Sequence, residues 1–339
     1  MSKFYYGGQA VMEGVMMRGR TSAAVAVRRP DGSIYLYEEA LNPRLYQNPW
    51  FRLPFLRGML LLWEMLVIGT RLMTLSANVA SGAVDLDASE ARAALIESAT
   101  LGMAGELPAA PEAEMKPPQI GGAALAFSLL ISLSFAVAIF FVGPLLIASL
   151  LHRQIGQGVL SLIVEGVIRL VLLIGYLFLI GRVPDIQRVF GYHGAEHKTI
   201  NAFEQGDPLD IPHVRRASRV HTRCGTGFLL LVMVVSIFVF AFFNLPSLPL
   251  KIISRIVLVP VVAGISYELM RLGAANYRYP LVRLLLAPGL ALQNLTTREP
   301  DDSMIECAIT ALRRVLRRDD VSTTGDIEEP DTALPPLAV

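Results

Sequence analysis

Five consecutive residues near the middle of the chain have types and spacing suited to binding a metal ion. They are His193-Gly194-Ala195-Glu196-His197, an H-x-x-E-H pattern in a chain with only five histidines. On a helix, histidines four residues apart project from one face and can bind a single ion. Glu196 is then placed to touch a metal-bound water, as in the inverted zinc-peptidase motif. The alternative is two surface histidines beside a carboxylate.

Further groups able to bind a metal follow in the sequence. His221 and Cys224 are three residues apart, so a helix would place both on one face, where they could complete this site or form a second one. The alternative is that Cys224 packs as a small buried residue and His221 caps or hydrogen-bonds locally. Glu204, eleven residues after His193, falls near the same helical face and is a candidate ligand or a support for one.

The composition indicates the environment in which this site must be built. The 339 residues are 53% hydrophobic and 17% charged, with a mean hydropathy of +0.49. This balance is too apolar for an ordinary soluble protein and predicts an α-helical, multi-pass membrane protein. The net charge of +1 argues against a nucleic-acid-binding protein.

A transmembrane domain is predicted over residues 120–270. A helix needs roughly 20 apolar residues to cross the bilayer, and four apolar segments reach or approach this length. The polar loop 182–224, which carries the H-x-x-E-H motif, joins the second and third of them. The segment 281–292 is too short to span and is expected at the surface. The four segments are 120–151, 155–180, 225–243 and 252–269.

Residues 1–54 are predicted to form a small glycine-rich region outside the membrane helices. Within it, 23–29 and 33–39 alternate in part, are rich in Val, Ile and Tyr, and flank a Pro-Asp-Gly turn, which is typical of a β-hairpin. The four glycines of 7–19 indicate close backbone packing or tight turns. A phosphate-cradling loop is the alternative reading of this segment, although no Lys-Ser/Thr pair follows it.

The helix predicted over 55–80 carries an unusual charge pattern. Arg57, Glu64 and Arg71 are seven residues apart and fall on nearly one stripe. Such a helix either lies in the membrane surface or packs that stripe against protein inside the membrane, and we do not expect it to be a fifth span. The remaining segments are a flexible linker at 81–119, surface helices at 271–318 that include an amphipathic helix at 303–316 capped by 301–303, and a disordered tail at 319–339.

Basic residues predict the orientation of the chain. The loop 182–224 is rich in Arg and Lys, whereas the connections on the opposite side offer only Arg153 and Lys251 outside the spans. The positive-inside rule therefore places this loop and both termini in the cytoplasm. The fourth span then brings Glu268 to the same membrane face, where it is the predicted third ligand, because inverted zincins also use a downstream glutamate. The alternative is that Glu268 reaches water or pairs with Arg271.

Four motifs recur in a recognisable order: GGQAVMEGVMMRG at 7–19, GYHGAEHKTINAFE at 191–204, HTRCGTGF at 221–228 and LQNLTTREPDDSMIECAITAL at 292–312. Together they resemble the bacterial YqhQ-like family of multi-pass membrane proteins, a domain of unknown function described as a predicted metal-dependent enzyme. The resemblance covers nearly the whole chain apart from 81–119 and the last residues, and it brings no substrate with it. The motif residues that it implies here are Glu13, Arg18, His193, Glu196, His197, Lys198, His221, Arg223, Cys224 and Glu268.

We therefore expect a protein of the bacterial inner membrane, with about four transmembrane helices, one interfacial or re-entrant helix and a small N-terminal β-hairpin region. We expect Zn²⁺ or another divalent transition metal to be held by His193, His197, Glu268 and His221, with Glu196 as the catalytic base of a hydrolase. Residues expected to support these are Glu204, Cys224, Arg223, Lys198, Glu13 and Arg18.

The expected partners are the lipid bilayer and a membrane peptide or a lipid-linked substrate, and the sequence leaves the oligomeric state open. Two alternatives come from other functional classes. One is a non-catalytic membrane scaffold or metal-transport protein, in which the same groups bind metal structurally or transiently. The other is a platform whose N-terminal β-region and C-terminal helix recruit a cytoplasmic partner.

Overall fold

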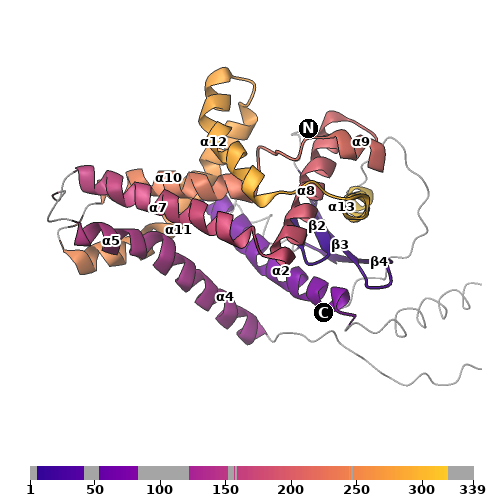
Figure 1. Cartoon of the computed structure of the whole chain (residues 1–339), viewed down its shortest axis with the longest axis horizontal. Coiled ribbons are helices and arrows are strands. Elements are labelled where there is room, and N and C mark those ends of the chain that lie inside the picture. The colour runs from indigo at the N-terminus through magenta and orange to yellow at the C-terminus, as the bar shows by residue number, and fades with distance from the viewer. Residues whose placement is uncertain are drawn as a thin grey trace, which may run out of the picture.

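The computed structural model describes residues 6–41, 53–82, 122–151, 156, 159–243, 245 and 247–319. A bundle of apolar helices and a four-stranded sheet with its covering helices follow one another along the long axis of the molecule (Figure 1). The predicted linker at 81–119 and the predicted tail at 319–339 lie outside the described residues, except for 81, 82 and 319 at their ends.

The N-terminal region is an antiparallel sheet in the order β1-β2-β3-β4. β1 (Gly7–Val11) and β2 (Gly14–Arg18) form one hairpin, and β3 (Ser22–Arg28) and β4 (Ile34–Ala40) form the next. The second hairpin is the predicted one. The first hairpin occupies the glycine-rich segment, which therefore forms paired strands and not a phosphate-cradling loop, with Glu13 at φ 52° in its turn.

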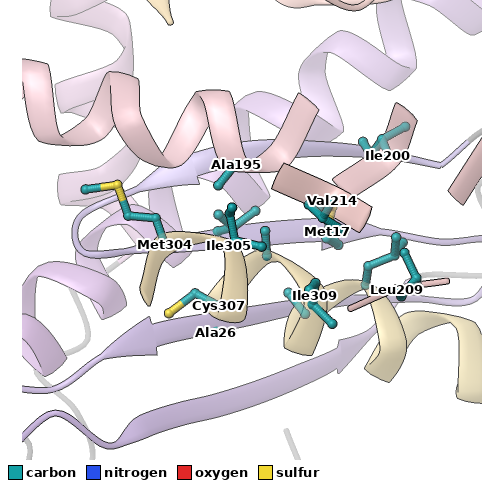
Figure 2. Close-up of a cluster of buried hydrophobic side chains, with 14 of the residues drawn as sticks. Met17, Ala26, Ala195, Ile200, Leu209, Val214, Met304, Ile305, Cys307 and Ile309 are labelled. Atoms are coloured by element: carbon teal, nitrogen blue, oxygen red, sulfur yellow. The ribbon is translucent and has the colours of Figure 1, made fainter. Parts of the chain in front are cut away.

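Alternate side chains of the sheet enter two separate hydrophobic cores, as the period of a strand requires. Val25 contributes to the core shared with α2 (Leu56–Ala80). Its neighbour Ala26 contributes to the core shared with α8 (Pro184–Gln205) and α13 (Asp302–Arg318). Figure 2 shows this second core, where small and branched side chains of the three elements meet. The sheet is thereby fixed against the helix that carries the H-x-x-E-H motif.

Within the described residues, five helices are long and apolar enough to cross a membrane, one more than the predicted number of about four. The additional helix is α2, whose three charges lie seven residues apart and leave it apolar enough to span. The four predicted segments all form helices. They are α4 (Gly122–Val137) continued by the π-helical η2 (Ala138–Val142) and α5 (Gly143–Leu150), then α7 (Val159–Ile180), α10 (Gly225–Phe242) and α11 (Leu248–Ala275).

α2 packs its charged stripe against protein. All three charges of the stripe form ion pairs with other elements, namely α11, β2 and β4. The later half of α2 also buries Leu72 and Val79 in the core that it shares with the sheet. The ion pairs are Arg57–Glu268, Glu64–Arg18 and Arg71–Glu39.

Three shorter helices complete the described chain. α9 (Ile211–Arg216) follows α8, and α12 (Pro280–Thr296) stands out from the side of the helix bundle (Figure 1). α13 is the predicted amphipathic helix, and the side chain of Asp301 caps it by accepting a hydrogen bond from the Met304 amide at 3.0 Å. The predicted surface helices at 271–318 are thus α12 and α13.

Candidate metal centre

The H-x-x-E-H motif lies inside one continuous helix, α8, as its spacing predicts. Pro184 begins the helix, where its fixed φ is favourable, and Gly206 ends it in the left-handed region at φ 80°. Gly194 allows another segment to cross close to His193, because a Cβ at this position would lie 2.1 Å from the Arg298 carbonyl oxygen. The glycine in the motif therefore serves backbone packing.

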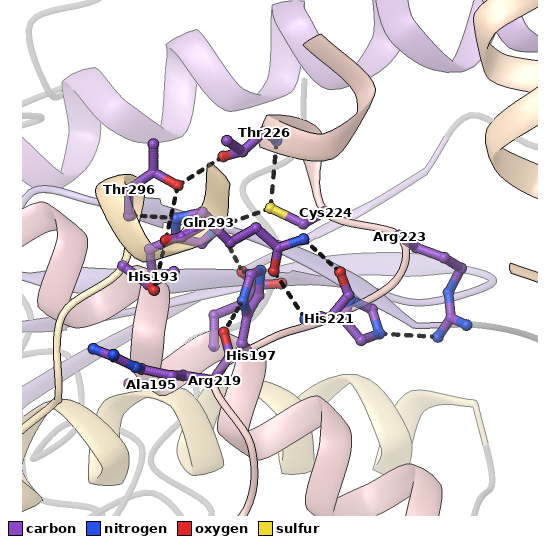
Figure 3. Close-up of polar contacts among 12 residues, drawn as sticks. His193, Ala195, His197, Arg219, His221, Arg223, Cys224, Thr226, Gln293 and Thr296 are labelled. Atoms are coloured by element: carbon purple, nitrogen blue, oxygen red, sulfur yellow. Dashed lines mark hydrogen bonds and ion pairs between the residues drawn. The ribbon is translucent and has the colours of Figure 1, made fainter. Parts of the chain in front are cut away.

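Three potential ligands converge beside this helix. One ligand atom each from His193, His197 and Cys224 lie within 4.8 Å of one another. The Nε2 atom of His193 is 3.4 Å from the Sγ atom of Cys224, and the two imidazole rings are 4.4 Å apart between centroids. Cys224 is brought here as the N-cap of α10, where its sulfur accepts a hydrogen bond from the Thr226 amide at 3.3 Å (Figure 3).

Backbone carbonyls hold both imidazoles in one orientation. The Nδ1 atom of His193 lies 2.9 Å from the carbonyl oxygen of Thr296, and Nδ1 of His197 lies 2.6 Å from that of Arg219. A carbonyl oxygen only accepts hydrogen bonds, so each Nδ1 carries the proton. In the neutral ring, Nε2 is then left with its lone pair, which is the arrangement that metal-binding histidines adopt.

Glu196 lies against the same two rings. Its Oε2 atom is 3.8 Å from Nε2 of His193 and 3.8 Å from Nε2 of His197, and its side chain is buried. β1 passes directly over it, because a Cβ at Gly8 would lie 2.8 Å from Cγ of Glu196. The first glycine motif and the histidine motif therefore form one contact, although they are far apart in the sequence.

The donor set fits a divalent transition metal. Tetrahedral Zn²⁺ with bonds of roughly 2.0–2.3 Å separates its ligand atoms by about 3.5 Å, close to the observed spacing of His193 and Cys224. Two imidazoles and a thiol are ligands that zinc accepts, and three protein ligands leave one position open. The His193 side chain is 18% exposed, whereas that of His197 is 1% exposed, so the side of His193 is the more accessible.

Glu268, the predicted third ligand, is not part of this group. Both of its carboxylate oxygens bind the guanidinium of Arg57, and one of them also accepts a hydrogen bond from the Phe55 amide. The carboxylate thereby joins α11 to the start of α2. Its predicted alternative partner was Arg271, and the structure pairs it with Arg57 instead.

Comparison with known proteins identifies the family of this chain. Residues 53–318 match the model of the family described as Protein of unknown function (DUF1385). The chain belongs to this family. It is also 36% identical over 323 residues, 94% of either chain, to the Uncharacterized protein YqhQ of Bacillus subtilis (strain 168). No solved structure matches. The resemblance drawn from the four motifs is thus confirmed, and neither match names an activity.

Three other predicted residues lie beside the centre. His221 is buried, with its Nε2 atom 3.2 Å from Nη2 of Arg223 and 3.9 Å from Oε2 of Glu204. Burial raises the pKa of the Glu204 carboxyl, but the neighbouring His221 and the charge of Arg223 outweigh it and hold the pKa below its ordinary value. The ring of His221 is 5.6 Å from that of His197. We place these three groups next to the converging ligands, where they support the loop that presents Cys224.

The remaining predicted residues bind groups outside the three converging ligands. Lys198 donates to the carbonyl of Arg215 at 2.7 Å and pairs with Glu299 at 2.6 Å. Glu13, in the turn between β1 and β2, pairs with Arg188 at the beginning of α8 and accepts a hydrogen bond from Tyr192. Arg18 pairs with Glu64 of α2. They connect α8 and the sheet with their surroundings.

Sequence reasoning missed the contribution of α12. Gln293 bonds both backbone groups of His221: its Oε1 accepts from the amide at 2.9 Å, and its Nε2 donates to the carbonyl at 2.8 Å. Thr296 supplies the carbonyl for His193 and bonds the hydroxyl of Thr226 at 2.9 Å. The available signal was the start of the motif at 292–312, where Gln293 and Thr296 are polar residues in a largely apolar helix.

Proposed function

We propose that this chain is a membrane-bound, metal-dependent hydrolase whose ion, zinc or another divalent transition metal, is held by His193, His197 and Cys224. The observation that supports it is the convergence of these three ligands, with both histidines oriented through their Nδ1 atoms. Cys224 takes the place that the sequence assigned to Glu268. His221, the fourth predicted ligand, has the role of stabilising the loop before α10.

The proposed chemistry needs a base next to the ion. A bound divalent metal lowers the pKa of a coordinated water towards neutrality. The Glu196 carboxylate, 3.8 Å from both Nε2 atoms, is placed to accept the proton from that water and to return it to a leaving group. The carbonyls of Thr296 and Arg219 keep the two rings from turning during the reaction.

We propose that the site faces the cytoplasm at the inner face of the bacterial plasma membrane. Support comes from the basic residues of the loop that contains α8 and α9, and from the position of Cys224 at the first turn of the apolar helix α10. The sheet packs on α8, so it belongs to the same side. With the sheet and α8 on the same side, α2 does not cross the membrane and lies along its surface. Substrates that fit this location are membrane peptides and lipid-linked esters or amides.

The test combines metal analysis with one conservative substitution. Wild-type protein purified in lipid nanodiscs should contain about one equivalent of transition metal, and Glu196→Gln should retain it. Loss of the general base should lower the turnover of ester and amide probes by about 10²- to 10⁴-fold. Wild-type protein without bound metal would rule out the proposal, as would a Glu196→Gln variant with full activity.

The alternative class, a non-catalytic metal-binding scaffold or transporter, is favoured by one observation. Glu165 and Arg169 of α7 and Arg255 of α11 form a buried cluster of charges within the apolar bundle. Ionisable groups inside a membrane domain often mark a transport path. Proteoliposomes loaded with a zinc-sensitive dye test this: zinc uptake by the wild-type protein that protein-free liposomes do not show would favour transport over hydrolysis.

A further inference from the structure

α12 has two halves with opposite surroundings. Its first half exposes Leu281, Leu284 and Leu285, which are 67%, 70% and 71% exposed. Residues spaced i, i+3 and i+4 lie on one face of a helix, so the three leucines form one apolar face, called here the leucine face. These exposures leave the face open among the described residues, and α12 stands out from the helix bundle in Figure 1.

The second half of α12 is buried at the metal centre. Gln293 is 1% exposed and binds both backbone groups of His221. Along the chain, His221 lies between Arg219, which supplies a carbonyl, and Cys224, which supplies a sulfur. Thr296 orients His193 through its carbonyl oxygen. α12 continues as one helix through Pro288 and therefore connects the leucine face with the groups that position the ligands.

The surroundings of the leucine face favour a lipid surface as its occupant. The face adjoins the last turns of α11, where a Cβ at Gly273 would lie 3.2 Å from Leu286 and where Leu269 and Leu272 are also exposed. Tyr279 and two arginines, Arg278 and Arg283, stand at the start of α12. Tyrosine rings and arginine side chains favour the headgroup layer, and arginines attract anionic lipids. With 17 residues, α12 is about 25 Å long and cannot cross a hydrocarbon core of about 30 Å.

We propose that the leucine face of α12 binds the surface of the lipid bilayer and that this contact holds Gln293 and Thr296 in place at the metal centre. The proposed lipid contact is inferred only from the exposed leucines and the neighbouring arginines. The effect on the metal centre rests on the proposed function. A helix released from lipid would move at its buried end as well, loosening the loop that carries Cys224 and the carbonyl that orients His193.

The first experiment measures the lipid contact. A nitroxide spin label is attached at Leu284→Cys in full-length protein in liposomes of phosphatidylethanolamine and phosphatidylglycerol, with Arg317→Cys on α13 as a water-exposed control. Both native cysteines are buried. We expect the label at 284 to collide severalfold more often with oxygen than with a water-soluble nickel chelate, and the label at 317 to show the reverse. Equal access to the chelate at 284, or spin–spin broadening that shows a second copy on the face, would overturn the proposal.

The second experiment measures the coupling to the metal centre. The double variant Leu281→Glu/Leu284→Glu is compared with Leu281→Met/Leu284→Met, which keeps the face apolar. In liposomes, the glutamate variant should lose zinc to a chelator at least several times faster than the methionine variant. Equal rates would overturn the coupling. Wild-type protein without metal would refute the proposed function and the coupling together, whereas the spin label decides the lipid contact in either case.

Discussion

At the scale of single residues, the candidate centre depends on groups that neither bind the metal ion nor transfer a proton. Two backbone carbonyls and one glutamine side chain determine where His193, His197 and Cys224 point. Partners of this kind typically contribute 10- to 100-fold to metal affinity, even though they never touch the ion. The ligand set is therefore a property of how three helices and one loop meet.

Substituting the competing ligands separately distinguishes Cys224 from Glu268. We expect Cys224→Ala to lower zinc affinity by at least about 100-fold, since a lost ligand should cost at least as much as a lost supporting partner. Glu268→Gln should leave zinc affinity unchanged, because that carboxylate binds Arg57. Zinc titration against a fluorescent chelator measures both. If Glu268→Gln loses the metal and Cys224→Ala keeps it, the predicted glutamate ligand is right.

Glu13 should make the contact between sheet and α8 sensitive to acid. The hydrogen bond from Arg188 holds the pKa of the Glu13 carboxyl below its ordinary value of 4.5. Its stabilising effect is therefore complete above pH 4.5 and disappears as the pH falls through the lowered pKa. Thermal unfolding of wild type and Glu13→Gln should differ at pH 7 and converge in acid. A constant difference down to low pH would contradict this.

At the scale of elements, glycines decide how closely the segments of the site approach one another. Gly8 of β1 makes room for Glu196, and Gly194 of α8 makes room for the backbone at Arg298. Both contacts join motifs that are distant in the sequence. In the N-terminal motif, Gly8 therefore serves close packing against α8, while Gly14 packs against β3 and Gly19 against the end of α13. Close packing was one of the two readings of that segment.

Gly194→Ala tests this packing. The added methyl group would meet a carbonyl oxygen at 2.1 Å, which can be relieved only if the backbone moves. We expect a loss of about 1–3 kcal/mol of stability, as for other overpacked sites, together with weaker zinc binding. Gly175→Ala in α7 is the matched control, since a Cβ there meets nothing within 4 Å. Equal melting temperatures of the two variants would show that the close approach is not important.

At the scale of the whole molecule, a buried charge cluster connects three apolar helices. Glu165 and Arg169 of α7 pair with each other, and Arg255 of α11 binds both carboxylate oxygens of Glu165. Arg169 also donates to the hydroxyl of Ser236 on α10 at 2.9 Å. The ring of Phe240 lies 4.2 Å from the Arg255 guanidinium carbon. The predicted pair of Glu165 with Arg169 is thus part of a larger network.

Glu165→Gln should destabilise the bundle strongly. It would leave two buried arginines without a negative partner, and breaking a buried ion pair costs about 3–5 kcal/mol. Glu306→Gln is the control, because its pair with Arg28 is 52% exposed on the glutamate side and should contribute less than about 1 kcal/mol. Unfolding in mixed micelles by increasing denaturing detergent compares the two. Similar midpoints would mean that the network contributes little.

The sequence by itself determined the helices, the second hairpin, the apolar character of the helix bundle and the motif that contains His193 and His197. These follow from hydropathy, turn residues and spacing along a few turns of chain, where neighbours in sequence are neighbours in space. It also identified the stripe of α2, but it undercounted the helices that are apolar enough to span.

The tertiary structure alone decided that Cys224 rather than Glu268 meets the histidines. Cys224 is 31 residues from His193, and the carbonyl of Thr296 that orients this ring is 103 residues away. Contacts over such separations depend on how the ends of α8, α10 and α12 pack, and no local pattern records that. A carboxylate on the expected membrane face can bind a metal ion or a basic side chain. For Glu268, the group close enough to bind is the guanidinium of Arg57.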